Sequence, residues 1–351
     1  MSGSLSSSLQ VVGIPGIGEV VAGDDVAGLL VDALHAQRTS LGEGDVVAVS
    51  SKVLSKAAGL TAPASEREEV VLRESRRLVA ARRTPHGTAR VVEAAAGPVM
   101  AAAGVDASNV VGDVVLLLPH DADAAARALR DRLRELTGAT VGVVVTDTAG
   151  RPWRAGQTDF ALGSAGLDVL DDLRGRTDTS GRTLTVTARA VVDEIAAAAD
   201  LVKGKTSGVP AALIRGLGEL VLDASVDAPG ARSLVRTAAG DWFRLGHVEA
   251  VRAALGAGSV EPPPIEPGTL EERLGRAAEV ACAAGPGAGA SVAVEDDGTG
   301  PALRLSAEDD FTLGVLTQRV LAAVWTESLV GLVDRDPGDG GVLVRVVELP
   351  R

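Results

Sequence analysis

Short apolar runs separated by amphipathic segments fill the first 255 residues of the chain. Runs rich in Val and Leu predict buried strands, and alternation of apolar with polar residues predicts a half-buried strand. The predicted strands are residues 45–50, 114–119, 141–147, 183–188 and 209–216. Because helical patterns lie between them, the sequence predicts a mixed α/β (α+β) fold.

Polar side chains mark the starts of two helices in the first third of the chain. Asp24 or Asp25 is expected to cap a helix, because a side-chain oxygen there accepts a free backbone N–H. Ser65, followed three residues later by Glu68, forms a capping-box pattern. We therefore expect a charged helix over residues 65–80.

Two further helices are expected in the middle of the chain. Asp121 or Asp123 begins a helix that carries leucines on one face. Gly138 ends it, since glycine readily adopts the left-handed conformation of a helix C-terminus. The segment 189–202 predicts another helix, which leads into a glycine-containing turn.

A proline-rich stretch, EPPPIEPG at 261–268, marks the clearest boundary. Consecutive prolines force an extended segment that neither a helix nor a central strand can use. The pattern divides the chain into a main domain at 1–255, a linker at 256–267 and a small C-terminal α/β domain at 268–351. Within the last of these, we expect helices at 269–284 and 309–330, a hairpin at 296–300 and a strand at 342–349.

The composition excludes several classes of protein. Hydrophobic residues make up 46% of the chain, which is enough for a sizeable core. The single cysteine, Cys282, allows no intrachain disulfide and is compatible with a cytoplasmic location. The N-terminus lacks the pattern of a signal peptide and no apolar run is long enough to span a membrane, so we expect no membrane partner. A net charge of −13 argues against nucleic acid as a partner.

Two glycine- or hydroxyl-containing loops are candidates for binding phosphate. GIPGIG at 13–18 lets backbone N–H groups approach a ligand, although Val21 breaks the dinucleotide-binding pattern and a simple turn is the alternative. SSKVLSK at 50–56 places hydroxyl and ammonium groups at the end of a strand, which suits phosphate oxygens. Its alternative is a solvated loop.

Two other loops carry oxygen ligands. AAAGVDASN at 101–109 contains Asp106 and Asn109, which are hard ligands or, alternatively, parts of an Asx turn. TDTAGRPWRAGQT at 146–158 offers Asp147 and Thr148 to Mg²⁺ or Mn²⁺. If that turn is helical, its two arginines lie on one side and neutralise phosphate during catalysis; the alternative is a strand-to-helix connection with Asp147 as a cap. These two candidate catalytic residues are Arg151 and Arg154.

GKT at 204–206 resembles the end of a P-loop but is not one. Ala199 stands where the required glycine belongs, and a helix pattern precedes the segment. Lys203 and Lys205 remain candidates for holding phosphate. The scattered histidines show no metal-ligand spacing.

Five blocks of sequence, taken in order, resemble the F420 gamma-glutamyl ligase family, the coenzyme F420-0:L-glutamate ligases, over roughly residues 10–245. The blocks are GIPGI, GDVVAVSSKVLSKAAG, AAAGVDASN, VTDTAGRPWRAGQTDFALGSAGL and DEIAAAADLVKGKTSGVPAALIRGL. The resemblance implies a GTP-dependent enzyme that forms an acyl phosphate on F420-0, or on its growing tail, and couples it to L-glutamate. It also implies Mn²⁺ or Mg²⁺, a monovalent cation such as K⁺, a family-specific fold and an intertwined homodimer.

The resemblance carries site roles onto matching positions. Metal ligands would be Asp106, Asp147 and Thr148. Nucleotide contacts would come from Ile14, Pro15, Gly16, Ile17, Ser51, Lys56, Asn109, Lys203, Gly204, Lys205 and Gly208.

Two departures from the family affect these expectations. Some members carry an acidic residue where Lys205 stands, so a second metal site here uses the backbone carbonyl or is weaker. The segment after residue 267 is shorter than the FMN-binding nitroreductase-like domain of many relatives, and we expect it not to bind FMN. The alternative functions are a GTP-binding regulatory homologue without ligase turnover and a phosphotransferase that makes only the acyl phosphate.

Overall fold

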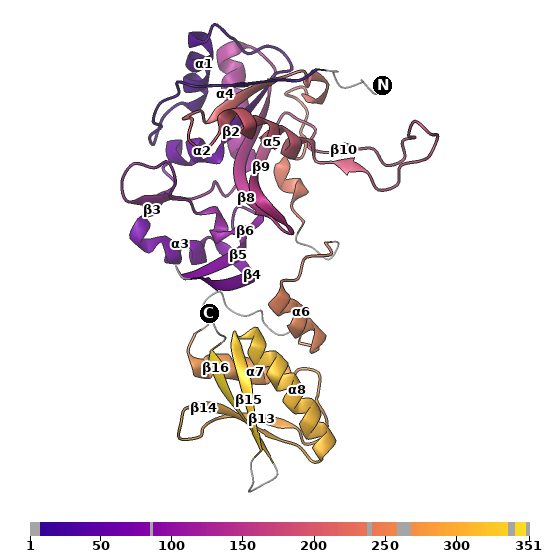
Figure 1. Ribbon diagram of the computed structural model, residues 1–351. Helices are drawn as coiled ribbons and strands as arrows, with labels where there is room; N and C mark the ends of the chain where they lie inside the picture. Colours follow the sequence, from indigo (N-terminus) through magenta and orange to yellow (C-terminus); the bar gives the residue numbers. More distant parts are fainter. Residues whose placement is uncertain (1–7, 85–86, 237–240, 258–267, 336–340, 349–351) are drawn as a thin grey trace. The chain divides into compact units, whose positions relative to one another are not determined.

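The chain forms two compact units in the computed structural model, which describes residues 8–84, 87–236, 241–257, 268–335 and 341–348 (Figure 1). The first unit consists of residues 1–74 and 94–236, and the second of residues 75–93 and 237–351. The second unit therefore takes in a segment from the middle of the expected main domain. Most of the expected linker, residues 258–267, lies outside the described residues.

A five-stranded sheet organises the first unit. Its strands, in spatial order, are β1 (Gln10–Gly13), β12 (Ala211–Arg215), β2 (Val46–Ser50), β8 (Gly142–Arg151) and β9 (Arg154–Ala165). β2 and β8 run parallel, and the other neighbours are antiparallel. The strands expected at 45–50, 141–147 and 209–216 are thus confirmed, and they lie next to one another in the centre of the sheet.

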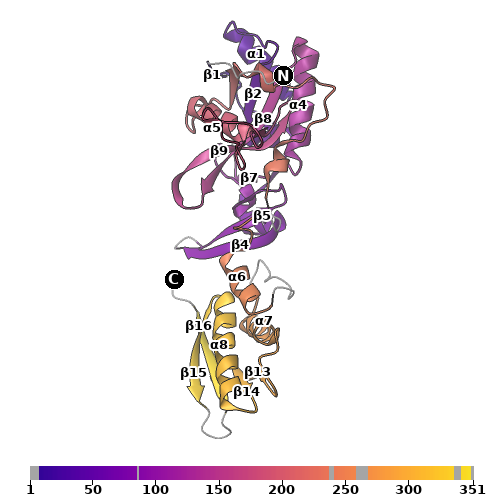
Figure 2. The same ribbon diagram turned by 90° about the vertical axis from the view of Figure 1, so that its right-hand side faces the viewer.

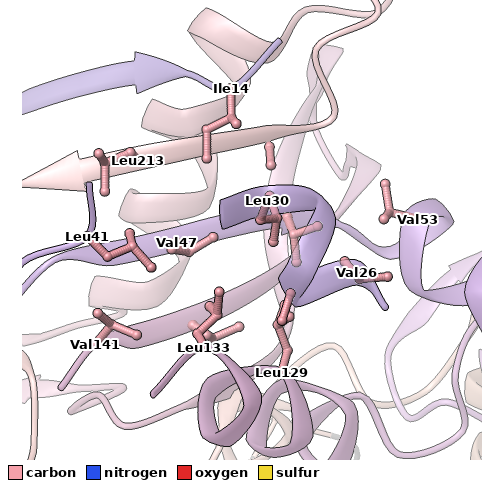
Figure 3. Close-up of a cluster of buried hydrophobic side chains, with 14 of the residues drawn as sticks. Ile14, Val26, Leu30, Leu41, Val47, Val53, Leu129, Leu133, Val141 and Leu213 are labelled. Atoms are coloured by element: carbon pink, nitrogen blue, oxygen red, sulfur yellow. The ribbon is translucent and has the colours of Figure 1, made fainter. Parts of the chain in front are cut away.

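Helices cover both faces of this sheet. α1 (Val26–Ala36) and α4 (Ala122–Thr137) pack on one face and α5 (Val191–Lys203) on the other (Figure 2). Leu30 and Leu133 are fully buried against Val47 in the core beneath α1 and α4 (Figure 3). This burial explains why the strands read as nearly continuous apolar runs.

The helix caps follow the sequence. Asp25 accepts a hydrogen bond from the N–H of Gly28, and Asp121 accepts one from Ala124. Gly138 ends α4 in the left-handed conformation, with φ 75°. These local predictions are confirmed because a cap needs only neighbouring atoms.

The helix expected over 65–80 is confirmed only over residues 67–73 and is wrong for the rest of that range. A 3₁₀ turn (Ala64–Glu66) and the short helix α3 (Arg67–Arg73) are followed by the strands β4 (Ser75–Thr84) and β5 (Gly87–Ala94), which are neighbours in one sheet. Ser65 provides no side-chain cap. Strand pairing has outweighed the local helical pattern.

The strand expected at 183–188 is also largely wrong. Only Ala188–Arg189 (β11) is a strand, paired with Asp171–Asp172 (β10). The segment between them extends away from the sheet (Figure 1), with one isolated bridge from Thr177 to Thr183. The alternating pattern fails here because most of this segment has no neighbouring strand to pair with.

Smaller elements complete the first unit. β3 (Thr61–Pro63) pairs with β7 (Val114–Leu116), so the run expected at 114–119 is a strand only in its first half. These elements are α2 (Ser51–Ala57), β3 (Thr61–Pro63), β6 (Val99–Ala101), β7 (Val114–Leu116) and the 3₁₀ turns Ala102–Gly104, Gly218–Leu220 and Ala231–Leu234.

The second unit ends in a four-stranded antiparallel sheet with order β13-β14-β16-β15. Its elements are α6 (His247–Ala254), α7 (Leu270–Cys282), β13 (Ser291–Asp296), β14 (Pro301–Ser306), α8 (Asp310–Thr326), β15 (Leu329–Arg335) and β16 (Val342–Glu348). The expected first helix, hairpin and last strand are confirmed, but the second helix ends earlier and β15 follows it. Among the described residues, no helix has the length and apolar character needed to cross a bilayer.

Candidate functional site

A cavity of about 480 Å³ opens in the first unit where several chain segments end. β2 and β8 are parallel, with Ser50 opposite Thr146, so β2 ends beside the point where β8 continues beyond their pairing. The end of α5 and the start of β12 close the same region. The lining comes from residues within 18–20, 50–56, 109–111, 146–148 and 200–210, and from Asp159.

All four lysines of the chain line this cavity. Lys and Arg together number 34, and the four lysines are Lys52, Lys56, Lys203 and Lys205, so the remaining 30 basic residues are arginines. An ammonium group is a compact point charge with three rotatable donors, whereas a guanidinium is a planar fork. The four lysines therefore bring compact charges with rotatable donors to one cavity.

The first two lysines form ion pairs on one side of the cavity. Lys52 Nζ lies 2.5 Å from Asp106 Oδ2, and Lys56 Nζ lies 2.6 Å from Glu19 Oε1. Lys56 also donates to the backbone oxygen of Asn109 at 2.8 Å. Burial acts to raise the pKa of Asp106, but the hydrogen bonds from Lys52 and Ser108 outweigh it and the pKa is lowered from 3.8.

Lys203 forms a buried ion pair with Asp159 at the end of α5. The two side chains are each 5% exposed, and Lys203 Nζ lies 2.6 Å from Asp159 Oδ2 and 2.5 Å from Thr146 Oγ1. Burial acts to raise the pKa of Asp159, but the charge and hydrogen bond of Lys203 and the hydrogen bond of Thr148 lower it below 3.8. Asp159 is therefore held as a carboxylate.

Asp159 also links this pair to Thr148 and Lys205. Thr148 stands opposite Asp159 in the antiparallel pair β8–β9, and its Oγ1 donates to Asp159 Oδ1 at 2.6 Å. Lys205 Nζ in turn donates to Thr148 Oγ1 at 2.7 Å. The result is a continuous row from Lys203 through Asp159 and Thr148 to Lys205.

Asp147 is a carboxylate of the cavity with no cation in contact with it. Burial raises its pKa to about 6, and the charges of Asp159 and Asp106 raise it further, whereas a hydrogen bond from the Thr148 backbone and the charge of Lys52 lower it. Ser51 Oγ donates to Asp147 Oδ1 at 3.4 Å. Within the part of the chain that the structure describes, no ammonium or guanidinium lies within 4.0 Å of this carboxylate. A bound cation would relieve this unfavourable charge.

The oxygen atoms around Asp147 suit one hard divalent ion. Carboxylate and hydroxyl oxygens are the ligands that Mg²⁺ and Mn²⁺ prefer, usually with substrate phosphates completing the shell. The described residues contain no cluster of three or more Asp, Glu, His or Cys side chains placed to hold a metal by themselves. An ion here would therefore need ligands from a bound substrate.

Most of the expected site residues come together at this cavity. Ser51 and Asp106 contact lining residues through their side chains. The expected residues that line the cavity directly are Lys56, Asn109, Asp147, Thr148, Lys203, Gly204, Lys205 and Gly208.

The segment Ile14–Ile17 does not line the cavity. Ile14 is fully buried in the core (Figure 3), and Ile17 is 6% exposed in the same cluster. Instead, Gly18, Glu19 and Val20 form the wall. The first loop therefore contributes to the cavity a few residues later than expected, because its isoleucines anchor it in the core.

The helical turn expected for the two arginines is wrong. β8 continues to Arg151, and β9 begins at Arg154, so the two residues are cross-strand partners at the tip of a hairpin. Both are exposed, and neither is among the residues that line the cavity. Asp147 consequently lies within a strand and does not cap a helix. The catalytic role of the arginines remains a prediction.

Sequence reasoning missed several lining residues. Lys52 lies in the segment 50–56, where the resemblance assigns a role only to Ser51 and Lys56. Asp159 and Asp200 lie outside the candidate loops that the sequence marks, because a strand and a helix must first fold to bring them to the cavity. The concentration of all four lysines in two short segments, 52–56 and 203–205, is the signal that points to Lys52.

Comparisons with known proteins identify the family of the chain. A family model described as F420-0:Gamma-glutamyl ligase matches residues 16–69 and 61–216. The chain is 39% identical over 257 residues to the Coenzyme F420:L-glutamate ligase of Methanopyrus kandleri, covering 68% of this chain and 98% of that protein. It is 39% identical over 258 residues to the protein of the same name from Halobacterium salinarum, covering 67% of this chain and 96% of that protein. Because the family model spans more than half of the chain and the relatives match over nearly their whole length, the chain belongs to the F420-0:gamma-glutamyl ligase family.

Proposed function

We propose that this chain is a GTP-dependent ligase that adds L-glutamate to coenzyme F420-0 and to the growing γ-glutamyl tail. One observation carries the proposal beyond family membership: the cavity gathers all four lysines of the chain beside the unpaired carboxylate of Asp147. Ammonium groups and backbone N–H groups of glycine-containing loops suit the phosphates of a nucleotide. The volume of about 480 Å³ is typical of ligand-binding pockets.

A divalent ion fits the oxygen donors of the cavity. Mn²⁺ or Mg²⁺, held by Asp147 and Asp106, would act as a Lewis acid toward phosphate oxygens. Thr148, the third expected ligand, already donates to Asp159 and accepts from Lys205. A monovalent cation such as K⁺ completes the proposed cofactors, and no residue is assigned to it.

The reaction divides into two substitutions. A carboxylate oxygen of F420-0 attacks the γ-phosphorus of GTP, and the bond to the bridging oxygen breaks to release GDP. The amine of L-glutamate then attacks the acyl carbon, phosphate leaves, and the nitrogen loses one proton as the amide forms. Positioning of the reactants converts this second attack into an effectively intramolecular step.

The residues of the cavity supply charge and orientation. The ammonium groups of Lys52, Lys56 and Lys205 lie where they can balance negative charge on the phosphates during transfer. The exposed loop that contains Gly204 and Gly208 offers backbone N–H groups to the same phosphates.

Incubation with F420-0, L-glutamate, GTP and Mn²⁺ tests the proposal. We expect mass spectrometry to show products heavier by whole glutamate residues, with an equal amount of GDP. GTP binding without any glutamate addition would instead support a regulatory homologue, and GDP release without glutamate addition would support a phosphotransferase. Either result would refute the ligase proposal.

The proposal also includes a homodimer, which the resemblance to the family implies, and a cytoplasmic location. Sedimentation velocity measures the assembly directly. A monomer at the concentrations used for the activity assay would contradict this part of the proposal alone.

A further inference from the structure

Lys205 differs from the other three lysines of the cavity. Lys52, Lys56 and Lys203 each lie within 2.6 Å of a carboxylate oxygen. No carboxylate among the described residues lies within 4.0 Å of Lys205, whose ammonium contacts the hydroxyl of Thr148 at 2.7 Å. Its side chain is exposed to the cavity. Lys205 is therefore a cation whose charge is not balanced by the protein around it.

The position of this ammonium is fixed by the hydroxyl of Thr148. The single proton of Thr148 is donated to Asp159 at 2.6 Å, which leaves the hydroxyl oxygen free to accept from Lys205. Asp159 is itself fixed by the buried Lys203 at 2.6 Å. Donation to a carboxylate makes a hydroxyl oxygen a better acceptor. The row thus holds one N–H of Lys205, while the other two point away from Thr148.

The backbone next to Lys205 is also fixed. Gly204 has φ +62°, a conformation that residues with a side chain rarely adopt, and it turns the chain at the end of α5. The Asn109 side chain donates to the backbone oxygen of Lys205 at 3.5 Å. The chain therefore turns at a defined residue, and this directs Lys205 into the cavity.

The charges of Lys205 and Asp147, which have no partner of opposite charge within 4.0 Å among the described residues, indicate what kind of ligand the cavity binds. Lys205 contributes one positive charge with no carboxylate within 4.0 Å among the described residues, Asp147 contributes one negative charge with no cation within that distance, and both line the same cavity. A polyphosphate with one divalent ion satisfies both groups at once. The hydroxyl oxygen of Thr148, the residue after Asp147, already accepts from Lys205, so a second ion at Thr148 would have to displace that ammonium.

We propose that the ammonium of Lys205 is a built-in cation that replaces a second divalent ion and contacts a phosphate oxygen directly. The inference rests on the proposed nucleotide site. Under it, the triphosphate binds with one divalent ion per chain, at Asp147, and retains measurable affinity when no divalent ion is present.

The test measures binding alone, with inorganic tripolyphosphate and a non-hydrolysable GTP analogue as probes. In EDTA, we expect Lys205→Gln to weaken binding of both probes by about 10- to 100-fold, the usual effect of losing one charge-assisted hydrogen bond. Electron paramagnetic resonance with Mn²⁺ should count one bound ion per wild-type chain in the nucleotide complex. Unchanged affinity of Lys205→Gln, or two ions in the wild type, would overturn the proposal.

A second variant tests the row that holds Lys205. Thr148→Val keeps the shape of the side chain and removes its hydroxyl. We expect it to weaken probe binding in EDTA, and to have little further effect once Lys205 is Gln, because the two residues act together. If the two effects simply add, Thr148 does not position Lys205 and the proposal fails.

The small number of lysines gives an independent readout. Selective isotope labelling of lysine reports only four side chains, all of them in the cavity. One labelled signal, assigned as Lys205 by its loss in Lys205→Gln, should shift when tripolyphosphate is added in EDTA; no shift would overturn the proposal. Because these measurements use neither F420-0 nor glutamate, a failure of the ligase assay with Lys205-dependent binding intact would refute only the proposed function.

Discussion

Replacing Asp147 with Asn should increase the stability of the metal-free protein while removing its response to metal. Burial raises the pKa of this carboxyl from 3.8 to about 6. The two pKa values differ by about 2.2, and a difference of one in pKa corresponds to about 1.36 kcal/mol. Ionising Asp147 therefore costs the folded state roughly 3 kcal/mol. Asparagine carries no charge and avoids this cost, although its N–H groups still need partners. We therefore expect a gain of about 1–3 kcal/mol at pH 8.

The sign of the effect sets its pH window. The folded protein binds the proton of Asp147 more tightly than the unfolded chain does, so stability falls as pH rises from 3.8 to about 6. The whole cost is present above that range and absent below it. The free energies of unfolding of wild type and Asp147→Asn should therefore differ little at the acidic end of this range and most at pH 8.

Thermal melts with and without Mn²⁺ provide the assay. For a unit of this size, each kcal/mol shifts the melting temperature by about 2–4 °C. We expect Asp147→Asn to melt higher than wild type at pH 8 without metal, to gain nothing from Mn²⁺ and nucleotide, and to lose glutamate addition. Wild-type Mn²⁺ affinity should fall about tenfold for each pH unit below about 6, because protons compete for the same oxygen atoms.

Asp193→Asn is the matched control. Burial also raises the pKa of Asp193, which lines a separate cavity of about 200 Å³ and accepts a hydrogen bond from Ala161 that an amide oxygen can replace. This variant should keep the response to Mn²⁺. If Asp147→Asn melts below wild type at pH 8, or if Mn²⁺ stabilises both proteins equally, the electrostatic reasoning for Asp147 is wrong.

Three other substitutions test the packing, each by urea titration. Asp159→Asn leaves the buried ammonium of Lys203 unpaired and should lower the free energy of unfolding by about 3–5 kcal/mol, with partial recovery in the double variant with Lys203→Met; an unchanged midpoint would contradict the role of the pair. Leu133→Ala empties a fully buried position beneath α4 and should cost about 2–5 kcal/mol; a smaller loss would mean that the core closes around the gap. Glu327→Gln removes the charge that Arg252 binds in the interior of the second unit, and should cost about 3 kcal/mol there while leaving nucleotide binding unchanged.

The elements that the sequence predicts well are those that neighbouring residues decide. The cap at Asp25 and the left-handed end of α4 at Gly138 depend on atoms within one turn of helix. The buried strand at 45–50 is long and apolar enough to be identified without knowing its partners. The same local reasoning predicts a helix that continues to residue 80, but from Ser75 onward the pairing of β4 with β5 decides the structure.

The candidate site divides in the same way. Asp147, Lys56 and Lys205 lie in segments whose polar residues follow apolar runs, so the sequence alone marked them as candidates for a binding or catalytic role. The resemblance to the family then assigned these segments to one nucleotide- and metal-binding site. It also assigned Ile14 to the nucleotide, although this side chain is buried in the core.

The sequence by itself determined the apolar strands at 45–50, 141–147 and 209–216, the helix caps and the list of polar segments, because each depends on residues close together in the chain. Only the tertiary structure decided that Asp159 faces Thr148 across two antiparallel strands and that Lys203 reaches both it and Thr146 from the end of a helix. These contacts join residues up to 57 positions apart. Their geometry comes from strand register and helix packing, which no short stretch of sequence contains.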